Sequence, residues 1–508
     1  MKEKIHLIHP FLLALSPAVF LWSQNFGEVP LREVFPVLFF LLLLYVVAWF
    51  FWKIFFSDLQ KRAIITSFSL VIVLLFNYVY NIFFDNTVLH LRFRWSFIVI
   101  FLILISFIYF LKKSKIDFSH LNKIISIAAG VFILISLAQV SYGYYGIYTS
   151  NNKNLYLDTK NNEEVTELRD IYYIILDGYS SSNVIKNVLG FEEIENFTFF
   201  LENNGFYIAD ESLSNYPETL LSLPSSLNML YLDEPNADRK HFSMAENHKV
   251  KDILKSYGYK YIHLGADAFT YFNRYADRNI NIGFFSPYQS LMWHNTIFKP
   301  IQDITGARIE RLAEKFGFLD TRKTQWQREK YKLEKLSELP EEKGPIFAFA
   351  HFLLPKGINV FDKDGRYLTE KEAKQNGSIK GYLNQVQYIN TGIEKVVNDI
   401  LRKSDNEPII IIQGDHGFPF YDNLDIIDNF ADPARARELV VPGKYSFPIL
   451  NAYYFPDGGD SLLYDSMTPV NTFRILFNHY FEQDLELLED ISYTVDSDDE
   501  TEFIVWDK

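Results

Sequence analysis

Long apolar runs dominate the first 150 residues of the chain, and shorter runs replace them afterwards. Five long runs lie at 7–22, 34–56, 64–84, 95–111 and 124–145, each near the roughly 20 residues that a helix needs to cross a bilayer. The first is the weakest, because Pro10 and Pro17 interrupt it. A cleaved signal peptide would explain one run but not four more. The pattern predicts a transmembrane domain of five helices over residues 1–148.

Positive charge between the runs predicts how such a bundle is oriented. Lysine and arginine gather in alternate loops, at Lys2, Lys4, Lys53, Lys61, Arg62, Lys112, Lys113, Lys115 and Lys123. The opposite loops carry only Arg32, Arg92 and Arg94. By the positive-inside rule the first set is cytoplasmic. With an odd number of spans, the chain after about residue 145 lies outside the cytoplasm of a plasma or inner membrane.

The second part of the chain has a different pattern. Residues 149–167 are polar and indicate a linker, and from Asp170 short apolar strands alternate with helical stretches. This alternation predicts an α/β fold with a largely parallel sheet over 168–490. Residues 491–508 contain DSDDETEF, which predicts a solvated acidic tail. Most acidic residues, and with them the net charge of −14, belong to this second part and argue against a nucleic-acid partner.

Several predicted strands end in a carboxylate or an imidazole. DIYYIILDG ends at Asp177, YKYIHLGAD near His263, GPIFAFAHF at His351, and EPIIIIQGDHG at Asp415 and His416. In open α/β sheets the ligand crevice lies beyond the carboxyl ends of the strands. Alone, Gly-Asp after an apolar run is usually a turn, and a lone histidine such as His263 is usually a core residue. Two carboxylates and one imidazole together indicate a site for one divalent metal, with Mn, Mg and Zn all open.

A hydroxyl beside such a metal has a candidate in SNYPETLLSLPSSLNML. Thr219 and Ser222 stand before a helical run, where free N–H groups favour a phosphate. The simpler interpretation is that both residues cap the helix. Cysteine is absent, which excludes disulfides, thiolate ligands, cysteine nucleophiles and a formylglycine made from cysteine.

These motifs, in this order, resemble the alkaline phosphatase and sulfatase superfamily. The resemblance is greatest to its membrane-bound branch, which contains lipoteichoic acid synthases and lipid A phosphoethanolamine transferases. It implies five spans followed by an extracytoplasmic alkaline phosphatase-like domain. It also implies that Asp177, Thr219, Asp415 and His416 bind the metal, and that Thr219 is the nucleophile.

Two further positions follow from the resemblance. FAFAHFLLPKG resembles the segment that supplies substrate-contacting histidines, and His351 matches the first of them, as a proton donor or acceptor. Lys356 stands where the second histidine is expected, and a lysine suits a phosphate better than a metal. Ser222 is the other predicted substrate-binding residue. A serine-type sulfatase pattern, Ser-x-Pro-x-Arg, fails because Ser226 replaces the arginine.

The resemblance implies an enzyme that moves a phospho-head-group, of phosphoglycerol or phosphoethanolamine type, from a lipid donor to an envelope glycan or glycolipid. A membrane-anchored phosphodiesterase or sulfatase-like hydrolase is the alternative, because fold alone does not decide the acceptor. A catalytically silent domain that binds or assembles envelope machinery is the third reading. The head group, the acceptor and the oligomeric state are left open by the sequence.

Overall fold

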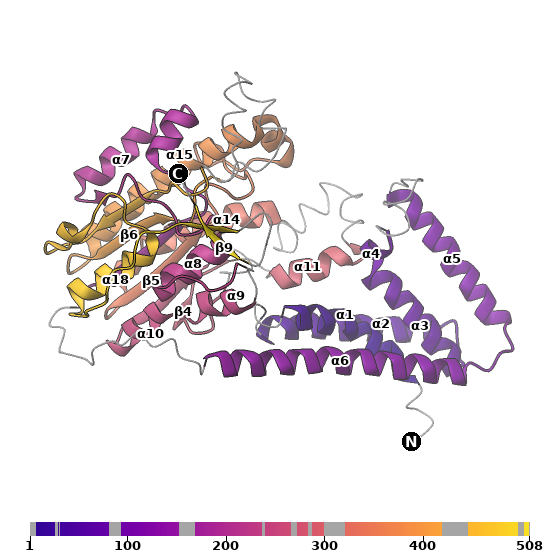
Figure 1. Ribbon diagram of the computed structural model, residues 1–508. Helices are drawn as coiled ribbons and strands as arrows, with labels where there is room; N and C mark the ends of the chain where they lie inside the picture. The colour runs from indigo at the N-terminus through magenta and orange to yellow at the C-terminus, as the bar shows by residue number, and fades with distance from the viewer. Residues whose placement is uncertain are drawn as a thin grey trace. The chain divides into compact units, whose positions relative to one another are not determined.

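The computed structural model describes residues 7–25, 29, 31–80, 93–151, 168–235, 239–265, 272–282, 287–298, 321–418, 445–495 and 502–506. The predicted linker therefore lies largely outside the described residues. The chain divides into two compact units (Figure 1). The first comprises Met1–Asn154 with Phe284–Asp320, and the second comprises Leu155–Gly283 with Thr321–Lys508.

The first unit is helical. Its helices are α1 (His9–Gln24), α2 (Leu31–Lys53), α3 (Leu59–Leu74), α4 (Phe76–Tyr80), α5 (Phe93–Lys113), α6 (Ser119–Asn151) and α11 (Pro287–Asn295). Each of the five predicted runs thus contains a helix. Among the described residues, two stretches are long and apolar enough to cross a membrane, Glu33–Lys53 and Ser119–Gly143. A five-span topology remains a prediction.

Helix α11 belongs to the first compact unit, although the sequence analysis placed its residues in the α/β domain. Residues 284–320 were assigned to the α/β domain, but they belong to the first unit. The reason is apolar burial: Tyr288 and Met292 are buried in one cluster with Ala18, Val34 and other residues of the N-terminal helices. The Tyr288 hydroxyl also donates to the backbone oxygen of Ala18 at 2.9 Å.

The second unit is built on a mostly parallel sheet, as the sequence predicted. Its strands are β1 (Ile171–Leu176), β2 (Tyr207–Ile208), β3 (Lys260–Leu264), β4 (Arg278–Asn279), β5 (Ile346–Phe352), β6 (Ile409–Gly414) and β7 (Asn451–Tyr454). In the described part their order is β2-β7-β6-β1-β5-β3-β4. Strand β1 is central and pairs in parallel with both β5 and β6, and only β7 runs antiparallel to its neighbours β6 and β2.

Two hydrophobic cores cover the two faces of this sheet. Alternate residues of β1 point to opposite faces, so Tyr172 and Ile174 enter one core and Tyr173 and Ile175 the other. The first core is closed by α7 (Ile194–Asn203), α14 (Thr321–Leu336) and α15 (Glu370–Lys403). The second is closed by α8 (Thr219–Asn228), α10 (Lys249–Ser256) and α18 (Pro469–Tyr480). The remaining elements are η3 (Val184–Val188), α9 (Arg239–Glu246), η4 (Leu339–Glu341) and η5 (Gly459–Leu462).

The C-terminal segment differs from the predicted solvated tail. Residues 491–508 contain β8 (Tyr493–Val495) and β9 (Phe503–Val505), which pair antiparallel. Their aromatic side chains explain the difference, because Tyr493 and Phe503 pack against the buried ring of Tyr216, with centroids at 6.0 and 5.1 Å. The acidic residues between the strands did not prevent this packing.

Candidate active site

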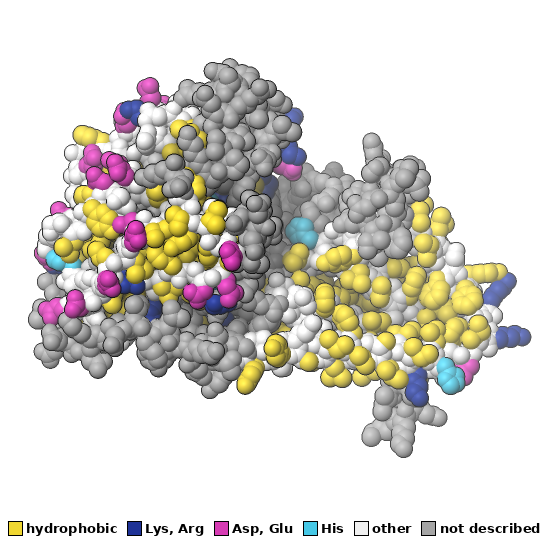
Figure 2. All heavy atoms as spheres, in the orientation of Figure 1, with side chains coloured by type: hydrophobic (Ala, Val, Ile, Leu, Met, Phe, Trp, Pro, Cys, Tyr) yellow, Lys and Arg dark blue, Asp and Glu magenta, His cyan; other side chains and the backbone are white. Residues whose placement is uncertain are grey.

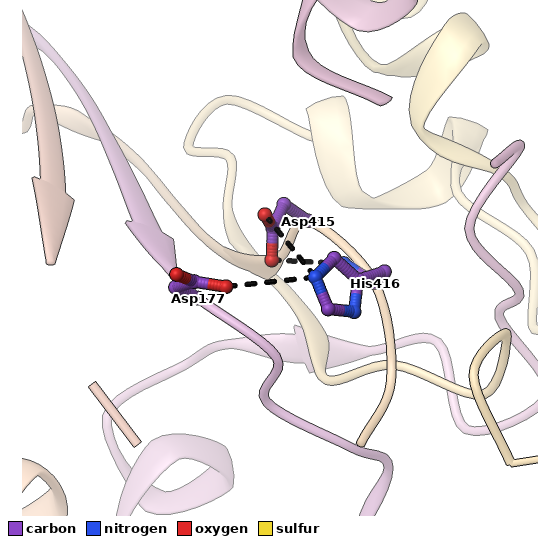
Figure 3. Close-up of side chains that lie close together, drawn as sticks. All are labelled: Asp177, Asp415 and His416. Carbon is purple, nitrogen blue, oxygen red and sulfur yellow. Dashed lines mark hydrogen bonds and ion pairs between the residues drawn. The ribbon is translucent and has the colours of Figure 1, made fainter. Parts of the chain in front are cut away.

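The predicted metal ligands meet at the carboxyl ends of two adjacent strands. Asp177 follows β1 and Asp415 follows β6, and the register pairs Leu176 with Gly414 just before them. His416 comes next along the chain. Ligand atoms of Asp177, Asp415 and His416 all lie within 4.8 Å of one another, and all three residues are buried (Figure 3). The three residues that the strand-end argument singled out therefore lie together in the structure.

Hydrogen bonds fix the carboxylate of Asp415. Its Oδ1 accepts from the backbone N–H groups of Gly178 and His416, both at 2.9 Å. The strand end is equally tight, since a Cβ at Gly414 would lie 2.3 Å from the backbone oxygen of Tyr179. The glycine of the Gly-Asp-His-Gly motif thus allows a close backbone contact, and the motif is more than a solvent-exposed turn.

The predicted nucleophile contacts this carboxylate. Thr219 is the first residue of α8, and its hydroxyl donates to Oδ2 of Asp415 at 2.6 Å. The first N–H groups of a helix have no partner within the helix, so they favour an anion here. Ser222 is placed differently: its buried hydroxyl donates to the backbone oxygen of Asp415 at 2.5 Å. It supports the loop, and its predicted role in substrate binding remains a prediction.

His416 and Lys356 form the other side of the cluster. Nδ1 of His416 donates to the backbone oxygen of Gly417 at 2.6 Å, and Nε2 lies 3.5 Å from Oδ1 of Asp177. The Lys356 ammonium lies 2.8 Å from that Nε2 and 3.4 Å from the same Oδ1. Lys356 therefore enters the predicted metal site itself, which its sequence position did not reveal.

Charge interactions within the cluster set its protonation. Burial alone would raise the pKa of Asp177, but His416, Lys356 and His351 together hold that pKa well below its ordinary value. Burial lowers the pKa of His416, yet the carboxylates of Asp415 and Asp177 outweigh it and raise that pKa. Asp177 is thus an anion at neutral pH, ready to bind a cation.

His351 lies one strand away from these groups. It is the sixth residue of β5, pairs in register with Ile175, and is fully buried. Among the interactions that lower the pKa of Asp177, the charge of His351 makes the smallest contribution. The proton-transfer role given to His351 remains a prediction.

Three supporting residues escaped the sequence analysis. Tyr382 donates to the backbone oxygen of Gly178 at 3.0 Å and accepts from the N–H of Ser180 at 3.2 Å, which fixes the loop after Asp177. Glu329 and Lys332 form a fully buried ion pair at 2.9 Å, and Lys332 also donates to the backbone oxygen of His351 at 2.6 Å. All three lie on helices that look polar or mixed in the sequence, so no local pattern marks them.

The residues present fit a divalent metal ion. Two carboxylates and one imidazole are the donors that Zn, Mn and Mg accept. Oδ1 of Asp177 is buried and accepts no hydrogen bond from the described residues. A buried carboxylate oxygen in that state is costly unless a cation faces it, and in this structure the Lys356 ammonium does so at 3.4 Å. Within the described part of the chain, no second group of this kind is found.

A comparison with protein-family models agrees with this fold. The Sulfatase family model matches residues 169–485, which is more than half of the chain. The chain therefore belongs to the sulfatase family of the alkaline phosphatase superfamily and is an enzyme of that class. None of the curated proteins compared with the chain matched it.

The chain is also similar, at low sequence identity, to several solved structures. The periplasmic domain of EptC from Escherichia coli is 12% identical, with a TM-score of 0.43, over 68% of this chain and 96% of that one. The same domain was also solved as a Zn complex, at 14% identity and a TM-score of 0.40 over 63% and 84% of the two chains. The integral membrane lipooligosaccharide phosphoethanolamine transferase A from Neisseria meningitidis is 14% identical, with a TM-score of 0.38, over 92% and 94% of the two chains.

Proposed function

We propose that this enzyme transfers a phospho-head-group from a membrane lipid to a hydroxyl of an envelope glycan or glycolipid, with Thr219 as the nucleophile. The observation that carries the proposal is the 2.6 Å hydrogen bond from the Thr219 hydroxyl to Asp415, at a helix N-terminus beside a buried Asp-Asp-His cluster. A nucleophile, a base-like carboxylate and an anion-binding helix end meet at one point.

The metal would be held by Asp177, Asp415 and His416, with the Thr219 oxygen as a further donor. When bound, it would neutralise negative charge on the hydroxyl oxygen and on a phosphoryl oxygen, the kind of stabilisation on which phosphoryl transfer depends most.

Asp415 and His351 transfer the protons, and Thr219 forms the covalent intermediate. The Thr219 oxygen attacks phosphorus as its hydrogen passes to Asp415, and the bond from phosphorus to the lipid oxygen breaks. His351 protonates that leaving oxygen, which leaves a phosphothreonine diester and a free lipid alcohol. The acceptor hydroxyl then attacks the diester, gives its proton to His351, and Thr219 leaves with the proton from Asp415.

The first unit supports a lipid donor. It contains helices long and apolar enough for the bilayer, and Figure 2 shows hydrophobic side chains covering this unit, whereas acidic side chains gather on the α/β unit. A membrane anchor keeps the site close to phospholipids. The charge pattern of the loops supports an extracytoplasmic α/β unit, where envelope glycans are found.

The test is an assay of purified full-length protein in lipid nanodiscs with Zn²⁺ or Mn²⁺ and a phospholipid labelled in its head group. The proposal predicts label on an added glycolipid acceptor, no transfer by Thr219→Ala, and transfer retained in part by Ser222→Ala. Release of label only into water would overturn transfer in favour of hydrolysis. Full transfer by Thr219→Ala would overturn the nucleophile.

A further inference from the structure

We propose that Lys356 competes with the metal ion for its site, so that the ion binds only when the Lys356 ammonium leaves the cluster. The inference rests on the metal site of the proposed function and not on the group that is transferred. It assigns to Lys356 a role that neither its sequence position nor the resemblance implies.

The Lys356 ammonium contacts the atoms that an ion would need. It lies 2.8 Å from Nε2 of His416 and 3.4 Å from Oδ1 of Asp177. Because Nδ1 of His416 donates to a backbone oxygen, Nε2 is the ring atom left for a cation. In the neutral ring, which either cation requires, the single lone pair of Nε2 cannot bind an ammonium N–H and a metal at once. A divalent ion on these two atoms would also stand within a few ångström of a positive charge.

The backbone holds Lys356 at this position. The N–H of Lys356 donates to the backbone oxygen of Asp177 at 3.0 Å. Gly178 makes room for the aliphatic stem, because a Cβ there would lie 2.6 Å from Cβ and 2.9 Å from Cδ of Lys356. Gly178 also has φ of +67°, which disfavours any other residue. The backbone hydrogen bond and the space at Gly178 therefore position the Lys356 side chain at the cluster.

The ammonium can also leave. The Lys356 side chain is 32% exposed, whereas those of Asp177 and His416 are 8% and 0% exposed. Four rotatable bonds let a lysine move its charge by several ångström while the backbone stays fixed. Turned away from the cluster, the ammonium becomes a point charge for the phosphate of the substrate. In the metal-free site Lys356 thus neutralises the carboxylates. In the metal-bound site its ammonium faces the substrate.

The first experiment measures Zn²⁺ affinity of the full-length protein by competition with a chromophoric chelator at fixed pH. Lys356→Met removes the charge and keeps most of the stem, and Lys343→Met, at an exposed position, is the matched control. Removing the competing charge should tighten Zn²⁺ binding about tenfold or more, with no change for Lys343→Met. Equal or weaker binding by Lys356→Met would overturn the inference.

A second measurement uses the unmodified chain. An amine-reactive label is applied with and without Zn²⁺, and the extent of modification is read from peptide masses. Labelling of Lys356 should increase several-fold with Zn²⁺ while that of Lys343 stays constant. Unchanged or reduced labelling of Lys356 would contradict its displacement.

One more variant separates the two proposals. Asp415→Asn should lose Zn²⁺ binding if the metal site is correct. Should it bind as the wild type does, the metal site of the proposed function fails. Should it lose Zn²⁺ while Lys356→Met binds as the wild type does, only the competition by Lys356 fails.

Discussion

The two units of this chain use the same apolar residues in opposite ways. In α2 large side chains face outward: Phe35, Phe39 and Phe50 are 59%, 70% and 58% exposed. In β1 every side chain from Ile171 to Leu176 is fully buried. Outward phenylalanines in water would form a large apolar patch, which soluble proteins avoid. This exposure is what we expect of a unit in contact with lipid, whereas the buried β1 is typical of a domain folded in water.

The buried polar groups of the two units differ in their charge and in how fully they are hydrogen-bonded. In the first unit His9 bonds to Ser67 at 2.6 Å and to Asn122 at 2.7 Å, so its ring is satisfied by neutral partners. In the second unit, Asp177, Asp415, His416 and Lys356 bring opposite charges together in one cluster, and Oδ1 of Asp177 accepts no hydrogen bond from the described residues. Buried polar groups with complete hydrogen bonding stabilise a structure. Clusters of buried charged groups are instead typical of ligand-binding and active sites.

The largest expected effect concerns the proposed chemistry, whose residues all lie in the second unit. Asp415→Asn removes the carboxylate that we propose accepts the Thr219 proton and binds the metal, and it should lower the transfer rate roughly 10³-fold or more. Steady-state rates of head-group transfer measure this. Asp364→Asn, at a 72% exposed carboxylate, is the control and should keep wild-type rates. A loss below tenfold for Asp415→Asn would break the assignment.

The buried ion pair of the second unit gives the next largest effect. Glu329→Gln leaves Lys332 buried and uncompensated, which costs about 3–5 kcal/mol. Near the end of the same helix, Lys335 and Glu338 pair at 2.6 Å but are 23% and 46% exposed, so Glu338→Gln should cost under about 1 kcal/mol. Hydrogen exchange of the β5 amides in the full-length protein measures both losses. Equal protection in the two variants would contradict this prediction.

A matched pair of substitutions tests whether α2 faces lipid while α7 faces water. Phe39 on α2 is 70% exposed and Phe199 on α7 is 65% exposed. Phe39→Asp should cost about 3 kcal/mol of membrane insertion, whereas Phe199→Asp should change stability by less than about 0.5 kcal/mol. The fraction of chains that resists carbonate extraction from membranes measures insertion. Should the two variants behave alike, α2 would not face lipid.

The smallest effect is a pH dependence of the second unit. Burial raises the pKa of Asp170 to about 6, despite the hydrogen bond that it accepts from the Ile346 N–H at 2.9 Å. A raised pKa means that the folded state holds the proton more tightly, so this contribution to stability is complete below about pH 4 and is lost as pH rises through about 6. Asp170→Asn should therefore flatten the decline in melting temperature between pH 4.5 and 7.

Asp364→Asn provides the comparison for this profile as well, and should keep the wild-type slope. A profile for Asp170→Asn that is as steep as the wild-type one would mean that another group causes the decline.

The meeting of the three candidate metal ligands at one sheet edge was predictable from the sequence. Asp177, Asp415 and His416 stand directly after apolar strands, and parallel strands end at one edge of the sheet. Thr219 needed the resemblance as well, because a threonine before a helix is ordinarily a cap. The central sheet followed from the same alternation of strands and helices.

Other features depended on contacts between distant residues. Glu329 and Lys332 lie in the helix TRKTQWQREKYKLEKL, whose buried face carries Leu333 and Leu336. Nothing in the local sequence indicates that a charged pair lies on that face as well. The association of α11 with the N-terminal helices depends on Tyr288 and Met292. Two apolar residues do not form a periodic pattern that would reveal this contact in the sequence. The hairpin of β8 and β9 depends on aromatic contacts to Tyr216 that outweigh an acidic composition.

The central claim is that Thr219 becomes covalently modified during the reaction. Full-length protein incubated with phospholipid and metal but without acceptor, then digested and measured by mass spectrometry, tests this most directly. We predict that the peptide containing Thr219 gains the mass of a phospho-head-group, and that Thr219→Ala removes the gain. The same adduct on Ser222, or product formed while the Thr219 peptide never carries an adduct, would contradict the account.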